Sequence, residues 1–273
     1  MTARYSLAHL TVLGLPPHEM TYLAHRAGYD MVSFRIIFMG LPGEPNYALA
    51  SNRQLLDQAK AALRDTGLVL NDIELAHIHD GLDPRSYLPA MEVAAELGGR
   101  CLLCSIWTPD RSFSVQAFAQ ICELARPLGL TVDLEFPTWA SVTNLRQALE
   151  VLRAANQPNA GVMVDALHFH RSRVKLEELD SVPREWFHFA HLCDAPPEIP
   201  TTKEELIHTG RDERLYLGEG GIDIAGILHH MPEVPYSIEL PHLKRVQEIG
   251  YAEHARRCLE TAKSYLAAHP RPA

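Results

Sequence analysis

The chain has 273 residues, of which 47% are hydrophobic and 22% charged, and its formal net charge is −9. This acidic balance disfavours a nucleic-acid partner, because binding a phosphate backbone needs clustered Lys and Arg that the chain lacks. No apolar run approaches the ~20 residues of a membrane span, and the N-terminus shows no long apolar region followed by a cleavage site. We therefore expect a cytoplasmic protein that binds neither membrane nor nucleic acid.

Apolar, β-branched runs alternate with helical patterns along the whole chain. Strands are predicted at 7–13, 31–37, 68–75, 101–106, 130–136, 161–165, 187–192 and 236–240. Helices are predicted at 17–27, 52–66, 84–97, 113–127, 142–155, 174–180, 203–208 and 249–267. Such alternation is typical of repeated βα units around a parallel sheet.

Eight such units predict an α/β fold with one (β/α)₈ TIM barrel over residues 1–268 and a flexible tail at 269–273. An open doubly wound sheet would more naturally carry a glycine-rich phosphate turn after its first strand, but the segment 13–17 holds one glycine. Cys101 and Cys104 have redox-motif spacing, yet positions three apart on a strand face opposite sides, so we predict buried structural cysteines.

Four ionisable residues lie at or just past the ends of the last four predicted strands: Glu135, Asp165, His191 and Glu239. In a parallel barrel these strand ends form the active-site face, so the four side chains should share one mouth. Three carboxylates and one imidazole suit Mn²⁺ or Mg²⁺, with Zn²⁺, Co²⁺ or Fe²⁺ as alternatives. Without a cation the three carboxylates would repel one another, which is the physical reason to predict one divalent ion here.

Five segments carry a family resemblance: 132–136 (VDLEF), 165–168 (DALH), 191–194 (HLCD), 217–223 (LGEGGID) and 237–239 (SIE). With the strand order, they resemble the sugar phosphate isomerase/epimerase group of xylose isomerase-like TIM barrels. That group includes inosose dehydratase, hydroxypyruvate isomerase, ketose 3-epimerases and 3-dehydroshikimate dehydratases. The resemblance implies that Glu135, Asp165, His191 and Glu239 bind one divalent cation, with His168 and loop arginines near the substrate.

The resemblance also implies a type of reaction. In such enzymes the metal chelates a carbonyl and an adjacent hydroxyl, and a carboxylate moves the proton beside the carbonyl, which gives an enediolate. By this similarity Glu135 and Glu239 are the acid/base pair, although each can equally be a ligand only. His168, three residues past Asp165, is predicted to face the substrate rather than to pack in its loop.

Substrate contacts are also predicted on earlier strands. Alternation places Arg35 and Glu74 inside the barrel, where Arg35 either holds a substrate carboxylate or phosphate or pairs with Glu74 as a structural bridge. Trp107 and Trp139 follow predicted strands, so they can stack on a sugar ring or simply pack at the rim.

Three further arginines and two aspartates complete the candidates. Arg171 is predicted as an anion contact, and family similarity alone suggests that Arg211 or Arg214, in a long loop able to form a lid, reaches the substrate. Asp133 is expected to support Glu135 by hydrogen bonding, and Asp194 either orients a ligand or caps the next turn.

These residues favour a metal-dependent isomerase or epimerase of a small sugar, polyol ketone or sugar phosphate. A lyase is the rival, because the same enediolate can expel a β-hydroxyl, as in inosose or dehydroshikimate dehydration. A zinc endonuclease of a related barrel type would need more His and Asp ligands and a basic surface, and a barrel that binds without catalysis is the remaining alternative. Rim helices of such barrels can bury a homodimer face, but no segment of the sequence identifies one.

Overall fold

The computed structural model describes residues 3–41 and 43–272. Within these residues nine strands form one parallel sheet: β1 Tyr5–Leu7, β2 Met31–Arg35, β3 Val69–Ile78, β4 Cys101–Ile106, β5 Thr131–Leu134, β6 Ala160–Val162, β7 Val164–Asp165, β8 Ala190–Leu192 and β9 Tyr236–Ile238. Their order in the sheet is β6-β5-β4-β3-β2-β1-β9-β8-β7. Only Met163 separates β6 from β7, so the two edge strands are consecutive pieces of one strand and the sheet nearly closes. The predicted TIM barrel is confirmed.

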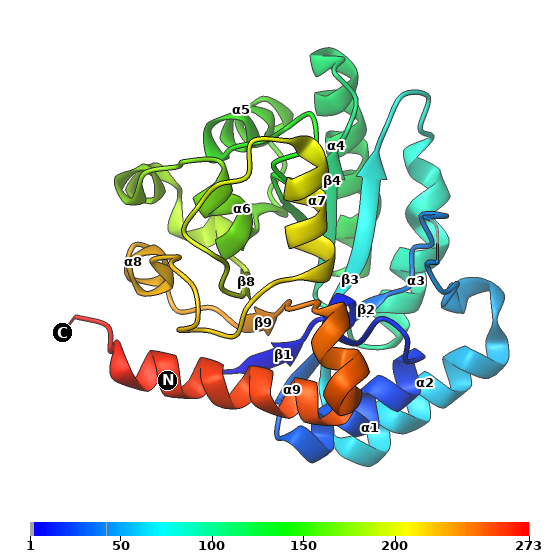
Figure 1. Cartoon of the computed structure of the whole chain (residues 1–273). Coiled ribbons are helices and arrows are strands. Elements are labelled where there is room, and N and C mark those ends of the chain that lie inside the picture. The colour runs from blue at the N-terminus through cyan, green and yellow to red at the C-terminus, as the bar shows by residue number, and fades with distance from the viewer. Residues whose placement is uncertain (1–2, 42, 273) are drawn as a thin grey trace.

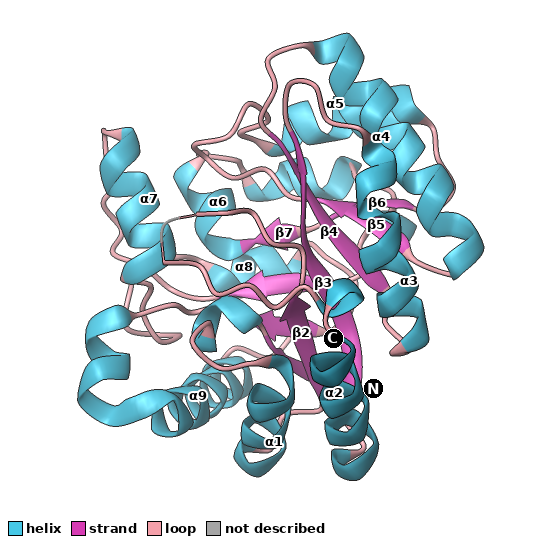
Figure 2. Cartoon of the chain, turned by 90° about the vertical axis from the view of Figure 1, so that its right-hand side faces the viewer, coloured by secondary structure: helices cyan, strands magenta, loops and turns pink. Residues whose placement is uncertain are grey.

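Helices surround the strands, most of them on the outside of the barrel (Figures 1 and 2). They are α1 Pro17–Ala27, α2 Arg53–Thr66, α3 Leu88–Glu96, α4 Arg111–Ala125, α5 Leu145–Ala155, α6 Ala166–Arg171, α7 Lys203–Asp212, α8 Ile224–His229 and α9 Leu243–Ala268. Side-chain caps begin several of them; for example, Asp110 accepts a hydrogen bond from the Phe113 N–H at the start of α4.

The strands are buried on both faces, as parallel barrel strands must be. All six residues of β4 are buried, and they alternate between two apolar clusters. Cys104 belongs to the large cluster between sheet and helices, whereas Cys101 joins the small cluster inside the barrel with Leu103, Met163 and Phe189. The five cysteines are free and buried, which agrees with the predicted structural role.

Two predicted elements were wrong. The first strand is Tyr5–Leu7, and most of the predicted span 7–13 is the 3₁₀ turn His9–Val12. This turn folds across the strand ends because the Thr11 hydroxyl donates to the Ile238 carbonyl and accepts from the Leu240 N–H. The helix predicted at 174–180 is a 3₁₀ segment as well.

The short helices α6 and α8 were not foreseen, and β3 runs on to Ile78. Each of these two helices has six residues, which is too short for a helical periodicity of buried apolar residues to show in the sequence.

The C-terminal helix α9 runs along one side of the barrel and bends at Gly250, whose φ of 75° is non-helical (Figure 1). Among the described residues no helix, α9 included, is long and apolar enough to cross a membrane. Of the tail predicted at 269–273, residue 273 lies outside the described residues. Within the tail, Arg271 donates hydrogen bonds to the carbonyls of Met231 and Pro232.

Candidate active site

Four side chains converge at the C-terminal mouth of the barrel. One ligand atom from each of Glu135, Asp165, His191 and Glu239 lies within 4.8 Å of the other three, and all four residues are buried. The backbone fixes their positions: the N–H groups of Glu135 and Glu239 continue the strand ladders by donating to the carbonyls of Cys104 and Leu192. The structure thus brings together the residues that the sequence analysis assigned to a cation.

Asp165 ends β7 and also begins α6. Its Oδ1 accepts hydrogen bonds from the N–H groups of Leu167 and His168, at 2.6 and 3.2 Å. Its Oδ2 faces His191 across 3.8 Å. One carboxylate therefore caps the helix that presents His168 and contributes to the acidic cluster at the same time.

The donor set fits a divalent cation. Both ring nitrogens of His191 are buried and make no hydrogen bond to any described residue, although Nδ1 lies 3.4 Å from Glu239 Oε2. A buried polar nitrogen without a partner is costly, and an imidazole nitrogen among carboxylate oxygens is what first-row divalent ions bind.

Arg214 supplies the positive charge inside this cluster. Its side chain is 2% exposed, and its guanidinium lies 2.7 Å from Asp165 Oδ2 and 2.8 Å from Glu239 Oε2. Nη1 also donates to the Glu239 carbonyl, and Nε donates to the Gly210 carbonyl at 2.7 Å. Family similarity suggested that Arg214 reaches the substrate. In the structure its guanidinium already pairs with two of the cluster carboxylates.

The environment drives the carboxyl pKa values apart. Burial raises the pKa of Glu135 well above its usual range, and the neighbouring Glu239 and Asp165 act in the same direction. Burial acts similarly on Asp165 and Glu239, but Arg214 and His191 outweigh it and lower both pKa values. Carboxyl groups with separated pKa values are typical of acid/base pairs.

A cavity of about 380 Å³ opens above the cluster. This volume lies in the range of small-molecule sites. Of the residues predicted as catalytic or as substrate contacts, the ones that line it are Glu135, Glu239, His168, Arg35, Glu74, Trp107, Trp139, Arg211 and Arg214.

Arg35 forms one wall of the cavity. Its guanidinium pairs with Glu74 at 3.4 Å, as one of the two predicted alternatives had it, and with Glu44 at 3.0 Å. Glu44 lies in the loop after β2, where nothing in the sequence marked it. Arg211 also lines the cavity but forms no ion pair in the part of the chain that the structure describes.

Asp72, a buried acidic residue beside the predicted Glu74, was also missed. Asp72 and Glu74 share the hydroxyl of Ser33 as hydrogen-bond donor, and burial raises the pKa of Asp72 to about 7. Ligand atoms of Asp72, Glu74 and His191 lie within 4.8 Å of one another. The pattern Asp-x-Glu at 72–74 repeats the one at 133–135, and this signal could have found it.

His168 lies beside Glu135, with Nε2 3.9 Å from Glu135 Oε1. Burial lowers the pKa of His168 to about 4, so the imidazole is neutral near pH 7. Its ring meets the Trp139 ring edge to face at 4.8 Å between centroids.

Trp139 also supports α7, the helix that stands over the central strands in Figure 1. A Cβ atom at Gly210 would lie 2.4 Å from Trp139 Cη2, so only glycine permits this close approach. Within α7 only Gly210 is buried.

Three predicted site residues lie away from the cavity. Arg171 lines a separate hollow, because its Nη1 is held by the carbonyls of Pro196 and Glu198. Asp133 pairs with His188 Nδ1 at 2.6 Å and accepts from Thr131, so it does not support Glu135.

Asp194 acts as a cap, which was one of its two predicted roles. Its carboxylate accepts hydrogen bonds from the N–H groups of Ala195, Gly218, Gly220 and Ile222. It thereby holds the glycine-rich turn before α8.

The fold and the buried cluster together define a (β/α)₈ barrel with a cluster at its mouth that could hold a metal ion. The profile of the xylose isomerase-like TIM barrel family matches residues 22–262, and the chain belongs to this family. The resemblance found in the sequence is confirmed.

Individual relatives are more distant. Inosose isomerase of Bacillus subtilis is 26% identical over 153 residues, which cover 55% of this chain and 52% of the relative. Ketose 3-epimerase of Arthrobacter globiformis is 23% identical over 233 residues, covering 77% and 71%. This chain matches about half the length of the inosose isomerases. A solved structure of the IOLI protein with a bound zinc atom has a TM-score of 0.80 at 18% identity, covering 98% of this chain and 99% of that one, which shows the shared fold.

Proposed function

We propose that this protein is a divalent-metal-dependent isomerase or epimerase of a small sugar, polyol ketone or sugar phosphate. The observation that carries the proposal is the convergence of Glu135, Asp165, His191 and Glu239 below a cavity of about 380 Å³. Mn²⁺ or Mg²⁺ suits this oxygen-rich set. A bound cation supplies Lewis-acid polarisation of a carbonyl oxygen, which acidifies the neighbouring C–H bond.

The protein side chains do the remaining chemistry. Glu135 and Glu239 both border the cavity and have pKa values shifted in opposite directions, so one can take the proton beside the carbonyl while the other returns it. Neutral His168 hydrogen-bonds a substrate hydroxyl. Arg211, which has no acidic partner among the described residues, contacts a polar or anionic substituent, and the Trp107 ring borders the sugar.

Arg35 and Glu74 act in this proposal as a paired wall. Because the Arg35 charge is already balanced by Glu74 and Glu44, its contact with substrate would be a hydrogen bond rather than a new ion pair. Their pairing keeps the cavity in shape while presenting polar edges to hydroxyl groups.

A dehydratase is the second candidate. A 3-dehydroshikimate dehydratase of Pseudomonas aeruginosa is 29% identical over 110 residues, which cover 40% of this chain and 17% of that protein. The chemistry begins in the same way, since an enediolate that expels a β-hydroxyl gives an unsaturated product.

Incubation with ketoses, inososes and dehydroshikimate in deuterated water with Mn²⁺ tests both candidates. Deuterium on the carbon beside the carbonyl, without dehydration, is the expected result, and Glu135→Gln should abolish it. An ultraviolet-absorbing unsaturated product would instead establish the lyase. Absence of exchange and of dehydration across the panel would refute the proposal.

A further inference from the structure

A second polar hollow, of about 390 Å³, lies outside the candidate active site. It shares no lining residue with the active-site cavity. Its walls come from the loop leading into α5, the C-terminal end of α6 and the segment leading into α7. Among the described residues that line it, two are arginines and none is acidic, although the chain carries a net charge of −9.

Arg171 is the central residue of this hollow. It is 6% exposed, and its hydrogen bonds within the described residues all use Nη1, to two backbone carbonyls and to the ring of His170. Its Nε is buried without a partner. Burial lowers the pKa of Arg171, which reflects how poorly the charged form is compensated.

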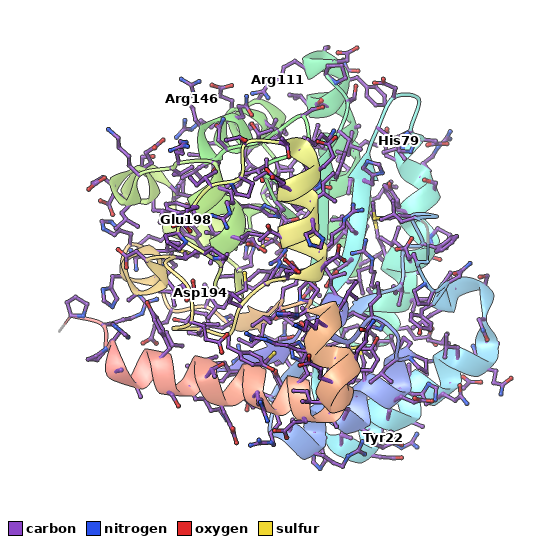
Figure 3. All side chains as sticks on the ribbon, viewed as in Figure 1. Tyr22, His79, Arg111, Arg146, Asp194 and Glu198 are labelled. Atoms are coloured by element: carbon purple, nitrogen blue, oxygen red, sulfur yellow. The ribbon has the colours of Figure 1, made fainter. Side chains whose placement is uncertain are left out.

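Besides the buried Cys193 thiol, two carboxyl groups act on Arg171, those of Glu198 and Asp194, both labelled in Figure 3. Glu198 is exposed, and the Asp194 carboxylate is already used by four backbone N–H groups. Neither forms an ion pair with Arg171 in residues 3–41 and 43–272. A buried guanidinium without a counter-charge is expensive, so a bound anion would compensate it.

The surrounding groups favour an anion too. The exposed guanidinium of Arg173 lies on the same hollow, and the Thr138 hydroxyl there is buried without a hydrogen bond. The 11-residue helix α5 begins at the wall with its N-cap Asn144, and helix N-termini attract anions. Phosphate is usually bound by two arginines together with hydroxyl groups and backbone N–H donors.

We propose that this hollow binds a phosphate dianion between Arg171 and Arg173, either as the free ion or as the phosphoryl group of a small metabolite. A phosphate there connects the end of α6 with the segment that leads into α7. Because α7 carries Arg211 and ends beside Arg214, binding would hold that helix over the barrel mouth.

Isothermal titration calorimetry of the full chain with inorganic phosphate, in EDTA and at constant ionic strength, tests the proposal. One phosphate per chain is expected, and Arg173→Gln should weaken it roughly tenfold, the effect of losing one charge-assisted hydrogen bond. Arg146→Gln is the matched control, because Arg146 is exposed in the first turn of α5, at the periphery in Figure 3, and does not line the hollow. It should bind as the wild type does.

Several results would overturn the proposal: no saturable binding, wild-type affinity in Arg173→Gln, or equal weakening in both variants. Loss of binding in Arg211→Gln instead would place the phosphate in the active-site cavity and refute the second site. A parallel titration with glycerol phosphate separates the two sources. Tighter binding than inorganic phosphate indicates a metabolite phosphoryl group, and weaker binding indicates the free ion.

Discussion

Arg214→Met removes a guanidinium that contacts both Asp165 and Glu239. In the folded protein this side chain is 2% exposed and lies within 2.8 Å of an oxygen of each carboxylate. Methionine keeps the length of the chain but donates no hydrogen bond. The substitution therefore leaves two carboxylates and the Gly210 carbonyl buried without their main donor.

The expected cost follows from the burial of these groups. Breaking a buried ion pair by removing one partner costs about 3–5 kcal/mol, because the remaining charge stays uncompensated. His191 lies near both carboxylates and retains part of the compensation, so we expect a loss near the lower end of that range. A divalent cation would replace the missing charge, and the loss should shrink when metal is bound.

Urea unfolding of wild type and Arg214→Met, in EDTA and in Mn²⁺, measures this loss. Arg257→Gln is the control, since Arg257 pairs with Glu253 where both side chains are substantially exposed, 48% and 33%. Such pairs contribute about 0–1 kcal/mol. A loss in EDTA no larger than that of the control would show that Arg214 does not compensate the buried carboxylates, and no recovery in Mn²⁺ would contradict the metal site.

Three further predictions follow from separate parts of the structure. Metal analysis should find one divalent ion per chain in the wild type and none in the Glu135→Gln, Glu239→Gln double variant; full occupancy in the double variant would contradict the ligand assignment. Gly210→Ala should lower the free energy of unfolding by about 1–3 kcal/mol, because its Cβ would lie 2.4 Å from Trp139 Cη2, and a measured stabilisation would disprove that contact. The pKa of His188 is raised above 6.5: burial opposes the charged ring, but the hydrogen bond and charge of its aspartate partner outweigh it. The stability that the His188–Asp133 pair contributes should therefore be complete below about pH 6.5 and be lost as the pH rises through the pKa of His188 in the folded protein. Urea unfolding measured across this pH range should show the loss in the wild type but not in His188→Gln.

The barrel could be predicted from the sequence because its strands are buried on both faces and read as short apolar runs. The first strand was misplaced for the same reason: three of the four residues of the turn His9–Val12 are buried, as they would be in a strand. The turn is held by hydrogen bonds of Thr11 to residues more than 220 positions away and by the backbone bond from the Ala8 N–H to the Ile238 carbonyl. Contacts between residues so far apart cannot be predicted from the local sequence.

Residues at strand ends could be located in advance because parallel strands deliver them to one rim. Side chains in loops could not. Glu44, for example, reaches Arg35 from the loop after β2. Arg171, the last residue of α6, was misplaced for a similar reason, because carbonyls in a loop 25 and 27 residues further on turn it away from the cavity. The position of a loop side chain depends on partners that only the folded chain brings near.

The charge balance of the cluster and the covering of the cavity depend on the same few residues. Arg214 joins Asp165 and Glu239 to the Gly210 carbonyl, and Gly210 rests on Trp139, whose ring meets His168 beside Glu135. A displacement of α7 therefore moves a donor of the cluster as well as the cavity wall. It follows that substitutions at the contact of α7 with the barrel should change metal affinity together with substrate affinity, although the substituted residues contact neither the metal nor the substrate.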